Sequence, residues 1–218
     1  MKQMSRRGFL GAAASSPFIG CRSSRKPAGI RVREITHDYE DYLYRTPIKF
    51  GGTVLNRATI LNVNCLIEAP NGRTAKGFGS MPLGNVWSFP SKAISYDGTL
   101  SAMKALAARN EKITAAYAET GHPIDINQAL EPEYVKAAGE VSRQLALAEP
   151  IPKLCMLVTA SPFDAAIHDA FGKLHSLNCY LTYGPEFIGY DLSHYLDADL
   201  CTGSVLGRSF ATTAWPDS

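Results

Sequence analysis

The sequence lacks the cysteine motifs of metal-binding and redox proteins. Its five cysteines include no C-x-x-C pair and no zinc-ribbon spacing, so the usual sequence signs of a zinc finger or a thioredoxin-like centre are missing. Five in 218 residues are also too few for a disulfide scaffold. They are Cys21, Cys65, Cys155, Cys179 and Cys201. We expect the last four to be buried or incidental thiols, with a disulfide as the alternative if the chain is exported.

Basic side chains are scarce outside the first 26 residues. That leader has no acidic residue and carries Lys2, Arg6, Arg7, Arg22, Arg25 and Lys26. Removing these six from the 22 basic residues leaves 16 against 20 acidic residues, a net charge of −4 from position 27 onward. The main part of the chain therefore lacks the basic patch typical of nucleic-acid-binding proteins. The apolar fraction of the whole chain, 45%, is that of a globular protein.

No apolar run in the leader is long enough to cross a membrane as a helix. Phe9 to Gly20 is 12 residues long, whereas a membrane span needs about 20. This run overlaps the end of Ser5-Arg6-Arg7-Gly8-Phe9-Leu10, which matches the twin-arginine export pattern through Arg6 and Arg7. We therefore predict a signal peptide over residues 1–20 and export by the twin-arginine route. An ordinary basic N-terminal helix is the alternative.

The end of the leader indicates a lipid anchor. Phe18-Ile19-Gly20-Cys21 resembles a lipobox, the tetrapeptide whose cysteine is lipidated after cleavage, although Phe18 replaces the usual Leu. Cys21 is thus the lipidation candidate, and simple cleavage with release is the alternative. Residues 21–29 are polar and basic and are typical of a short tether. The predicted location is the periplasm, either free or anchored to the membrane by the lipidated cysteine.

Three segments after residue 29 have the pattern of β-strands. The first, 30–39, alternates in polarity and slips at Glu34-Ile35, which predicts a bulge or a bend. A Gly-containing loop is expected over 46–53. The clearest strand follows, with one apolar face made of Leu61, Val63, Cys65 and Ile67. Asn71-Gly72 predicts a two-residue hairpin turn, and 74–79 is the returning strand of an antiparallel meander.

The apolar spacing then changes to that of helices. A first helix is expected over about 100–117, capped by Asp97 or Thr99. A second is expected between Pro132 and Pro150, and its buried residues would be Val135, Ala138, Val141 and Leu145. A third would begin at the capping box Ser161-Pro162-Phe163-Asp164. Its apolar stripe would be Phe163, Ala166, Ile167, Ala170 and Leu174. Strands first and helices second predict an α+β fold, a three-stranded antiparallel meander followed by a helical bundle.

One segment of the third helix carries a resemblance to a known family. The run from Ser161 to Lys173 is similar to the A-x-D-x-A-x-x-D-x-x-G-K segment of the enolase superfamily, mandelate racemase and muconate-lactonizing type. Gly77-Phe78-Gly79 resembles the G-x-G at the end of the third strand in that family, although Ser80 replaces the usual acidic residue. The resemblance covers about residues 30–190. It implies that residues 30–180 form the N-terminal capping domain of such an enzyme.

The resemblance implies a two-domain enzyme. In the family, loops of the capping domain cover the substrate, while a (β/α)8 barrel holds Mg²⁺ through three carboxylates. Barrel bases remove the proton α to a carboxylate, and the metal stabilises the resulting enediolate. The family reactions are racemisation, epimerisation, dehydration and cycloisomerisation. A small carboxylate is thus the implied substrate, the barrel the implied partner domain and Mg²⁺ the implied cofactor.

The barrel itself is absent from the sequence. Only 38 residues follow Tyr180, whereas a barrel takes about 200 at the least. The family's K-x-K pair and its spaced carboxylates do not occur, so no catalytic residue and no Mg²⁺ ligand is assigned. Residues 181–218 are predicted to be a barrel stub or an irregular tail, and our hypothesis is that a frameshift near residue 200 cut the barrel short. The chain is expected to be inactive alone and to self-associate through the exposed face that would meet a barrel.

Three residues are the substrate-loop candidates. In the family the loop between the first two strands closes over the active site, so Lys49 could meet an anionic group and Phe50 could exclude water. Trp87, after the third strand, is a weaker candidate for the second capping loop. For Lys49 and Phe50 the alternative is a merely flexible hairpin loop, and for Trp87 a core aromatic.

Other chemistry-bearing residues favour structural roles. Asp164 and His168 lie at i,i+4, but a cap and a packed histidine are expected there, and His175 lies too far along the helix to share one ion. Asp191, Ser193 and His194 do not form a hydrolase motif. Gly77 to Pro82 is not a dinucleotide fingerprint. Two hypotheses stay open: a family member that is catalytic only with a barrel, and a non-catalytic exported lipoprotein or binding module.

Overall fold

The computed structural model describes residues 29–50, 52–190 and 194–196. The predictions for Arg6, Arg7 and Cys21 therefore fall outside the described residues, as do those for Cys201 and the end of the chain. Of the predicted stub or tail, residues 181–190 and 194–196 are described, and 181–190 form the end of a short 3-10 helix followed by turns. Within the described part of the chain, no helix is long and apolar enough to cross a membrane.

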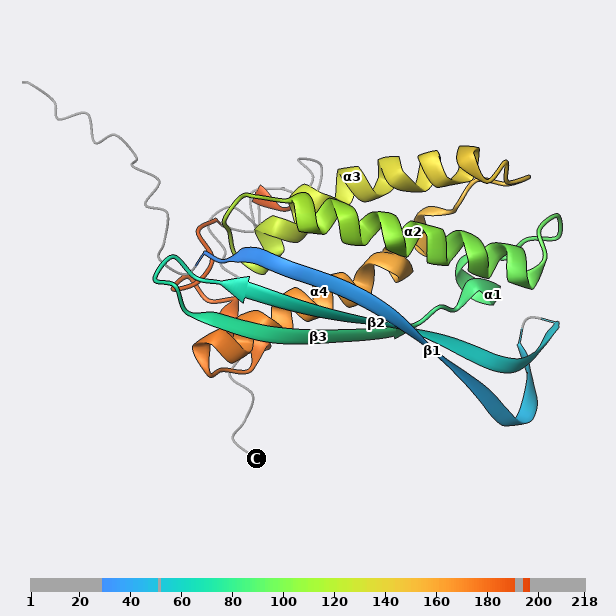
Figure 1. The fold of residues 1–218 in the computed structure, drawn as a ribbon, viewed down its shortest axis with the longest axis horizontal. Coiled ribbons are helices and arrows are strands. Elements are labelled where there is room, and N and C mark those ends of the chain that lie inside the picture. Colours follow the sequence, from blue (N-terminus) through green and yellow to red (C-terminus); the bar gives the residue numbers. More distant parts are fainter. Residues whose placement is uncertain (1–28, 51, 191–193, 197–218) are drawn as a thin grey trace, which may run out of the picture.

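Three antiparallel strands are followed by a set of helices, which confirms the predicted α+β class. The strands are β1 (Arg31–Phe50), β2 (Thr53–Glu68) and β3 (Thr74–Pro82), in the order β1-β2-β3. The helices are α1 (Asn85–Ser88), α2 (Tyr96–Ala116), α3 (Pro123–Gln144), α4 (Lys153–His175) and the 3-10 helix η1 (Cys179–Thr182). Figure 1 shows the helices gathered on one face of the sheet, with the β1–β2 hairpin projecting beyond β3. The described residues form no barrel.

The alternation of apolar and polar residues in β2 correctly predicts which of its side chains are buried. Leu61, Val63, Cys65 and Ile67 are all buried against the helices. Burial raises the pKa of the Cys65 thiol to about 12 and that of Cys155 to about 11, so both stay protonated and behave as packing groups. The two cysteines are buried as expected, and together with the partly buried Cys179 they are free thiols within the described residues.

The hairpins differ from their predictions in detail. The bulge expected near Glu34 lies at Arg33, where the register shifts between Val32 and Glu34. The second hairpin has a three-residue loop, because the carbonyl of Ala69 accepts the N–H of Gly72 and only Gly72 has a positive φ, of 82°. A two-residue Asn-Gly turn would need positive φ at both positions. The expected loop over 46–53 is mostly strand, since β1 runs to Phe50 and β2 starts at Thr53.

Each of the three long helices starts earlier than predicted. Ser95, and not Asp97 or Thr99, caps α2 by accepting the N–H of Gly98. α3 starts at Pro123, so Pro132 lies inside it. Ala138 and Val141 are buried as predicted. Val135 and Leu145, also expected in the core, are exposed: the buried stripe passes through Tyr134 instead of Val135, and Leu145 follows the end of the helix.

The predicted capping box at Ser161 lies in the middle of α4. Pro162 has no N–H to donate to the carbonyl of Val158 one turn earlier. The hydroxyl of Ser161 donates to that carbonyl instead, at 3.0 Å, so the helix continues through the proline. The stripe predicted from Phe163 to Leu174 is buried, and Lys173 Nζ lies 2.6 Å from Asp169 as expected for an i,i+4 pair.

β3 and α4 approach each other at two glycines. A Cβ added to Gly77 would lie 2.0 Å from the carbonyl oxygen of Ala166, and one added to Gly79 would lie 2.1 Å from that of Pro162. Asp169 then accepts the N–H of Phe78 at 2.9 Å, which covers a backbone donor on this outer strand. The G-x-G pair is therefore a packing feature of the sheet and not a phosphate-binding loop.

A buried histidine joins the start of α3 to the end of the described chain. His122 Nδ1 accepts the N–H of Ile124 at 3.2 Å, so Nε2 carries the proton and donates to the carbonyl of Thr182 at 3.0 Å. Desolvation, followed by the nearby His168, lowers the pKa of His122 to about 4. The neutral ring is thus the form that the fold requires.

We expect Gly77→Ala to lower the free energy of unfolding by about 3 kcal/mol or to prevent folding, because the added methyl group meets backbone that cannot move aside. The matched control is Gly139→Ala, a helical glycine of α3 whose added Cβ comes no closer than 3.6 Å to Arg143. It should stabilise the protein by up to about 1 kcal/mol. Urea unfolding measures both. Equal stability of the Gly77 variant and the parent would contradict the close-approach argument.

The second expected outcome concerns pH. The pKa of His122 in the folded state lies below its ordinary value of 6.5. The contribution of the neutral ring to the free energy of unfolding is therefore complete above pH 6.5 and is lost as the pH falls toward about 4. The loss should reach about 3 kcal/mol at pH 4. His122→Asn keeps a good N-cap and should remove this part of the pH dependence. Urea midpoints between pH 4 and 7 test it, and identical slopes for the two proteins would assign the effect to other groups.

Candidate functional site

The candidate site lies where the β1–β2 hairpin leaves the sheet. β3 pairs only with Ile60–Glu68, so the rest of β2 is paired with β1 alone. We call this two-stranded part, residues 41–50 and 53–59, the ribbon. Its strands carry a wide bulge, in which residues 44–47 of β1 oppose Asn56. An isolated two-stranded ribbon is only marginally stable in water, so contacts with the helices have to hold it.

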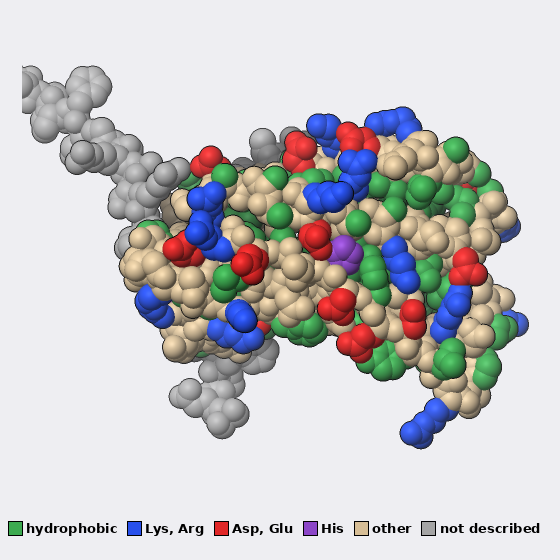
Figure 2. Space-filling model, in the orientation of Figure 1, with side chains coloured by type: hydrophobic (Ala, Val, Ile, Leu, Met, Phe, Trp, Pro, Cys, Tyr) green, Lys and Arg blue, Asp and Glu red, His purple; other side chains and the backbone are tan. Residues whose placement is uncertain are grey.

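The ribbon exposes an unusual amount of apolar surface. Leu43 is 82% exposed and Val54 is 66% exposed. The other large exposed side chains of the ribbon are Tyr42, Tyr44, Ile48 and Phe50. Figure 2 shows hydrophobic side chains mixed with basic ones at the end of the molecule that the hairpin forms, at the lower right. Such a surface indicates an interaction site.

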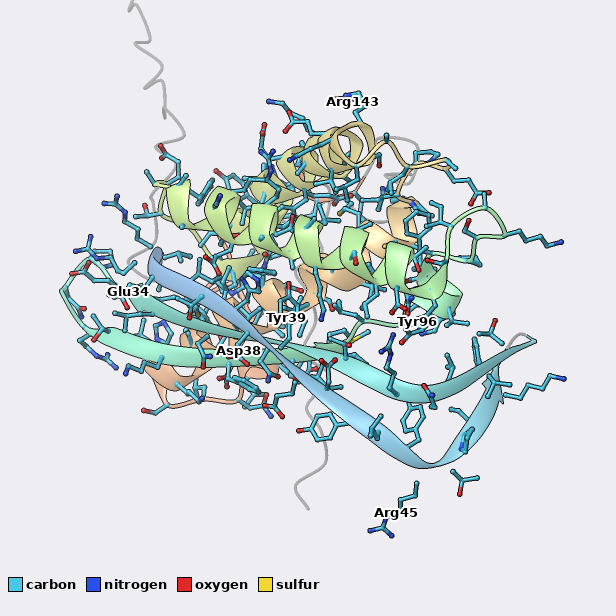
Figure 3. All side chains as sticks on the ribbon, turned by 45° about the vertical axis from the view of Figure 1, so that its right-hand side comes forward. Glu34, Asp38, Tyr39, Arg45, Tyr96 and Arg143 are labelled. Atoms are coloured by element: carbon cyan, nitrogen blue, oxygen red, sulfur yellow. The ribbon has the colours of Figure 1, made fainter. Side chains whose placement is uncertain are left out.

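The ribbon and the start of α2 are joined by one arginine. Arg57 of β2 forms an ion pair with Asp97 in the first turn of α2, and its guanidinium lies 5.3 Å from the centre of the Tyr96 ring. In Figure 3 Tyr96 lies at the start of α2 above the ribbon, while Arg45 points away from the helices. The pair is exposed, so its free energy is small, but it holds the two elements at a fixed spacing.

Two adjoining cavities lie in the space between the ribbon and the segment 85–96. The larger, of about 370 Å³, is bounded by Thr53 from the ribbon and by residues of the α1–α2 segment. The smaller, of about 320 Å³, lies between Leu43, Arg57 and Tyr96. Tyr96 borders both. The segments on either side of the cavities are the two that the sequence proposed as capping loops.

The polar groups of the larger cavity differ between floor and rim. Asn85 is buried and donates to the carbonyl of Tyr96 and to the hydroxyl of Thr99, at 2.9 Å in each case. Lys92 lies at the rim and is exposed. Among the residues that the structure describes, neither Lys92 nor Lys49 has an ion-pair partner. The rim therefore offers positive charge to a ligand.

The three substrate-loop candidates lie around this site but do not line the cavities. Lys49 and Phe50 are at the end of β1, and Phe50 is half exposed. Trp87 is 41% exposed, so it is not a core aromatic. Its indole folds back on the start of α1, because Nε1 lies 2.0 Å from the position that a Cβ on Gly84 would take. Sequence reasoning missed Asn85, Lys92 and Tyr96, although Lys92 stands in a segment rich in Pro and Ser that the helical pattern does not explain.

The two histidines of α4 contact neighbouring side chains of the domain. His168 Nδ1 lies 2.7 Å from Asp164, which also accepts from Asn127, and His175 packs with its ring 4.6 Å from that of Phe171. In the described ranges no three His, Cys, Asp or Glu side chains converge on a position where they could hold one metal ion. Of the three residues rejected above as a hydrolase motif, Asp191 and Ser193 lie outside those ranges, and the ring of His194 stacks on Tyr190 at 3.9 Å.

No protein-family model and no curated protein matches the sequence. Several solved structures resemble it. A Bradyrhizobium enolase complexed with magnesium and mandelic acid is 16% identical, with a TM-score of 0.41 over 68% of this chain and 33% of that one. A dipeptide epimerase from Enterococcus faecalis, complexed with Mg and a dipeptide, is 16% identical, with a TM-score of 0.37 over 74% of this chain and 35% of that one.

A third similar structure is the L-talarate/galactarate dehydratase of Salmonella typhimurium. It is 14% identical, with a TM-score of 0.37 over 84% of this chain and 37% of that one. The chain thus spans about a third of the length of the solved proteins that it matches.

The exposed ribbon generates a prediction. We expect the purified protein to bind a hydrophobic dye such as ANS at neutral pH, because the ribbon presents its apolar side chains to water. Replacing Leu43 and Val54 together by Thr should lower the dye fluorescence to about half. Val135→Thr, on the exposed face of α3, is the control and should change it little. Unchanged fluorescence in the double variant would mean that the ribbon is not the apolar surface that binds.

Proposed function

We propose that the chain is the capping and substrate-specificity domain of an enzyme of the mandelate racemase and muconate-lactonizing type of the enolase superfamily. The proposed reaction is removal of the proton α to a carboxylate, leading to racemisation, epimerisation or dehydration. The barrel that performs this chemistry in the family would be supplied by a longer reading frame or a second chain. Export and lipidation at Cys21, predicted from the leader, remain part of this proposal.

The segment 161–173 supports the family assignment through its packing. Ala166 is the residue against which Gly77 packs. Asp169 binds both the backbone of β3 and Lys173. An added Cβ on Gly172 would lie 2.8 Å from the carbonyl of Leu177, so a small residue is needed where the chain turns out of α4. Most positions of the family-like segment thus have a physical task in the joint between sheet and helix.

The observation that carries the proposal is the meeting of two segments at one end of the domain. Thr53 of the hairpin and residues 85–96 border one open cavity, and Lys49 lies on the same hairpin. Lys92 also lines this cavity and has no ion-pair partner among the described residues. A carboxylate ligand needs cationic partners and shelter from water. We assign charge recognition to the lysines and water exclusion to Phe50 at the end of the hairpin. These residues bind and orient, and none of them is proposed to move a proton.

Mg²⁺ does not fit the described residues as a ligand set. A divalent ion of this kind takes several carboxylate or carbonyl oxygens, and no such group of side chains converges within the described part. We therefore assign no metal ligand and no chemical step to this domain. The magnesium implied by the resemblance would belong to the barrel.

The first test is proton exchange. We expect the 218-residue protein to catalyse no Mg²⁺-dependent exchange of the α-proton of carboxylates in D₂O, measured by NMR on a panel containing mandelate, a dipeptide and an acid sugar. A capping domain that places no cation beside the reacting carbon cannot stabilise the negative charge that develops when the proton leaves. Metal-dependent exchange by this chain would overturn the proposal that it is a non-catalytic half.

The second part of the test is the DNA that follows the coding sequence. Translation in all three frames should contain a strand with a K-x-K pair and a spaced series of three carboxylates. Their absence from every frame, and from a neighbouring gene, would favour the alternative of an exported binding module without a catalytic partner.

A further inference from the structure

We propose that residues 179–188, which follow α4, form a pH-sensitive contact that opens on acidification while the sheet and the three long helices stay folded. We call these residues the end segment; they comprise η1 and the turns after it. In Figure 1 the end segment lies at the end of the domain opposite the projecting hairpin. The inference goes beyond the proposed function and does not rest on it, since it concerns only how this segment is held.

The first half of the end segment contacts two histidines. His122 at the start of α3 donates from Nε2 to the carbonyl of Thr182 at 3.0 Å. The centre of the Tyr183 ring lies 5.7 Å from that of His122 and 5.8 Å from that of His168. The centres of the two histidine rings are 6.3 Å apart. A positive charge on one ring would therefore disfavour a charge on the other.

The second half of the end segment contacts a third histidine. The centre of the Phe187 ring lies 5.1 Å from that of His175 and 6.0 Å from that of Phe171. The His175 ring also packs 4.6 Å from Phe171, so it lies among apolar rings. Desolvation, followed by the nearby Arg73 guanidinium, lowers the pKa of His175. The neutral ring is thus the form that packs against Phe187.

The observed geometry suits the neutral form of all three rings. Nδ1 of His122 accepts the N–H of Ile124 at 3.2 Å, so a proton added there would face a second donor. Asp164 lies 2.7 Å from Nδ1 of His168, which leaves Nε2 for the added proton. Nε2 of His168 and Nε2 of His175 are both buried without a hydrogen-bond partner among the described residues. Because a charged imidazole donates from both nitrogens, its charged form would leave a buried donor unsatisfied.

The groups that face His122 act in both directions. Desolvation and the nearby His168 disfavour its charged form, whereas Asp125 and the Thr182 carbonyl favour it. The balance lowers the pKa of His122 to about 4. Tyr183 of the end segment carries no charge in the acid range, because burial raises its pKa to about 12. Acid therefore charges His122 more readily once the end segment has moved away from it.

The end segment buries little apolar surface of its own. Ile188 is buried and Phe187 is partly buried, whereas Tyr180 and Leu181 are exposed. A segment with few buried apolar contacts opens at a lower free energy than the core strands and helices do. Protonation of the histidines should therefore release the end segment before it unfolds the domain.

Hydrogen exchange of the whole chain at pH 7 and pH 5 tests the inference. The probes are the N–H groups of Phe187 and Ile188, which both donate to the carbonyl of Gly184 at 3.0 Å. With a pKa of about 4 for His122 in the closed form and 6.5 in the open form, the opening equilibrium should rise about 20-fold between the two pH values. The buried amides of β2 should stay far more protected than these probes at both pH values.

Variants assign the effect to the histidines. His122→Asn should remove most of the 20-fold change, because the amide does not titrate. His175→Phe keeps an apolar ring beside Phe187, so it should retain the protection at pH 7 and narrow the change. His37→Gln is the matched control, since His37 pairs with Glu111 between β1 and α2, and it should retain the full change.

Three results would overturn the inference. They are equal protection of the end segment at pH 7 and pH 5, equal protection of the end segment and β2 at pH 5, and an unchanged pH effect in both His122→Asn and His175→Phe. The second result would mean that acid unfolds the whole domain at once. Each readout is independent of proton exchange on carboxylates, so this inference and the proposed function can fail separately.

Discussion

The close approach of the α4 backbone to β3 is the contact on which the rest of the domain depends. It brings the carbonyls of Ala166 and Pro162 to positions where only glycine fits on the facing strand. The thiol of Cys65 on β2 lies 3.1 Å from the same Ala166 carbonyl, so two strands contact one turn of the helix. Asp169 then fixes the register by taking the Phe78 N–H. Because α2 and α3 pack on α4 in turn, the sheet and the helical layer share this joint.

The sheet was the part of the fold that sequence reasoning described best, because alternation in β2 reports directly which side chains are buried. The helix starts were not found, and proline explains two of the errors. Pro162 looked like a first-turn residue, but Ser161 supplies the hydrogen bond that allows it inside α4. Pro132 looked like the start of the next helix, whereas His122 caps α3 nine residues earlier, at Pro123. A histidine cap is not among the usual helix start signals, so local sequence gave no warning.

The site could be predicted only in outline. The resemblance indicated two capping loops, and the structure has a long hairpin and the segment 85–96 at the same end of the domain (Figure 1). The residues that line the cavity could not be predicted, because Lys92 and Tyr96 become neighbours of the hairpin only through the Arg57 contact with α2. A contact between residues 40 positions apart leaves no periodic trace in the sequence.

The single-layered construction of the ribbon has a consequence for how such a domain can diverge. All residues from Glu40 to Phe50 are exposed, so none of them contributes to the core that β2 builds a few positions away. Substitutions between Tyr42 and Phe50 should therefore leave the core unchanged, while the pairing of β2 with β3 holds the base of the hairpin. The side chains that the hairpin exposes can thus differ between related domains without a change of fold.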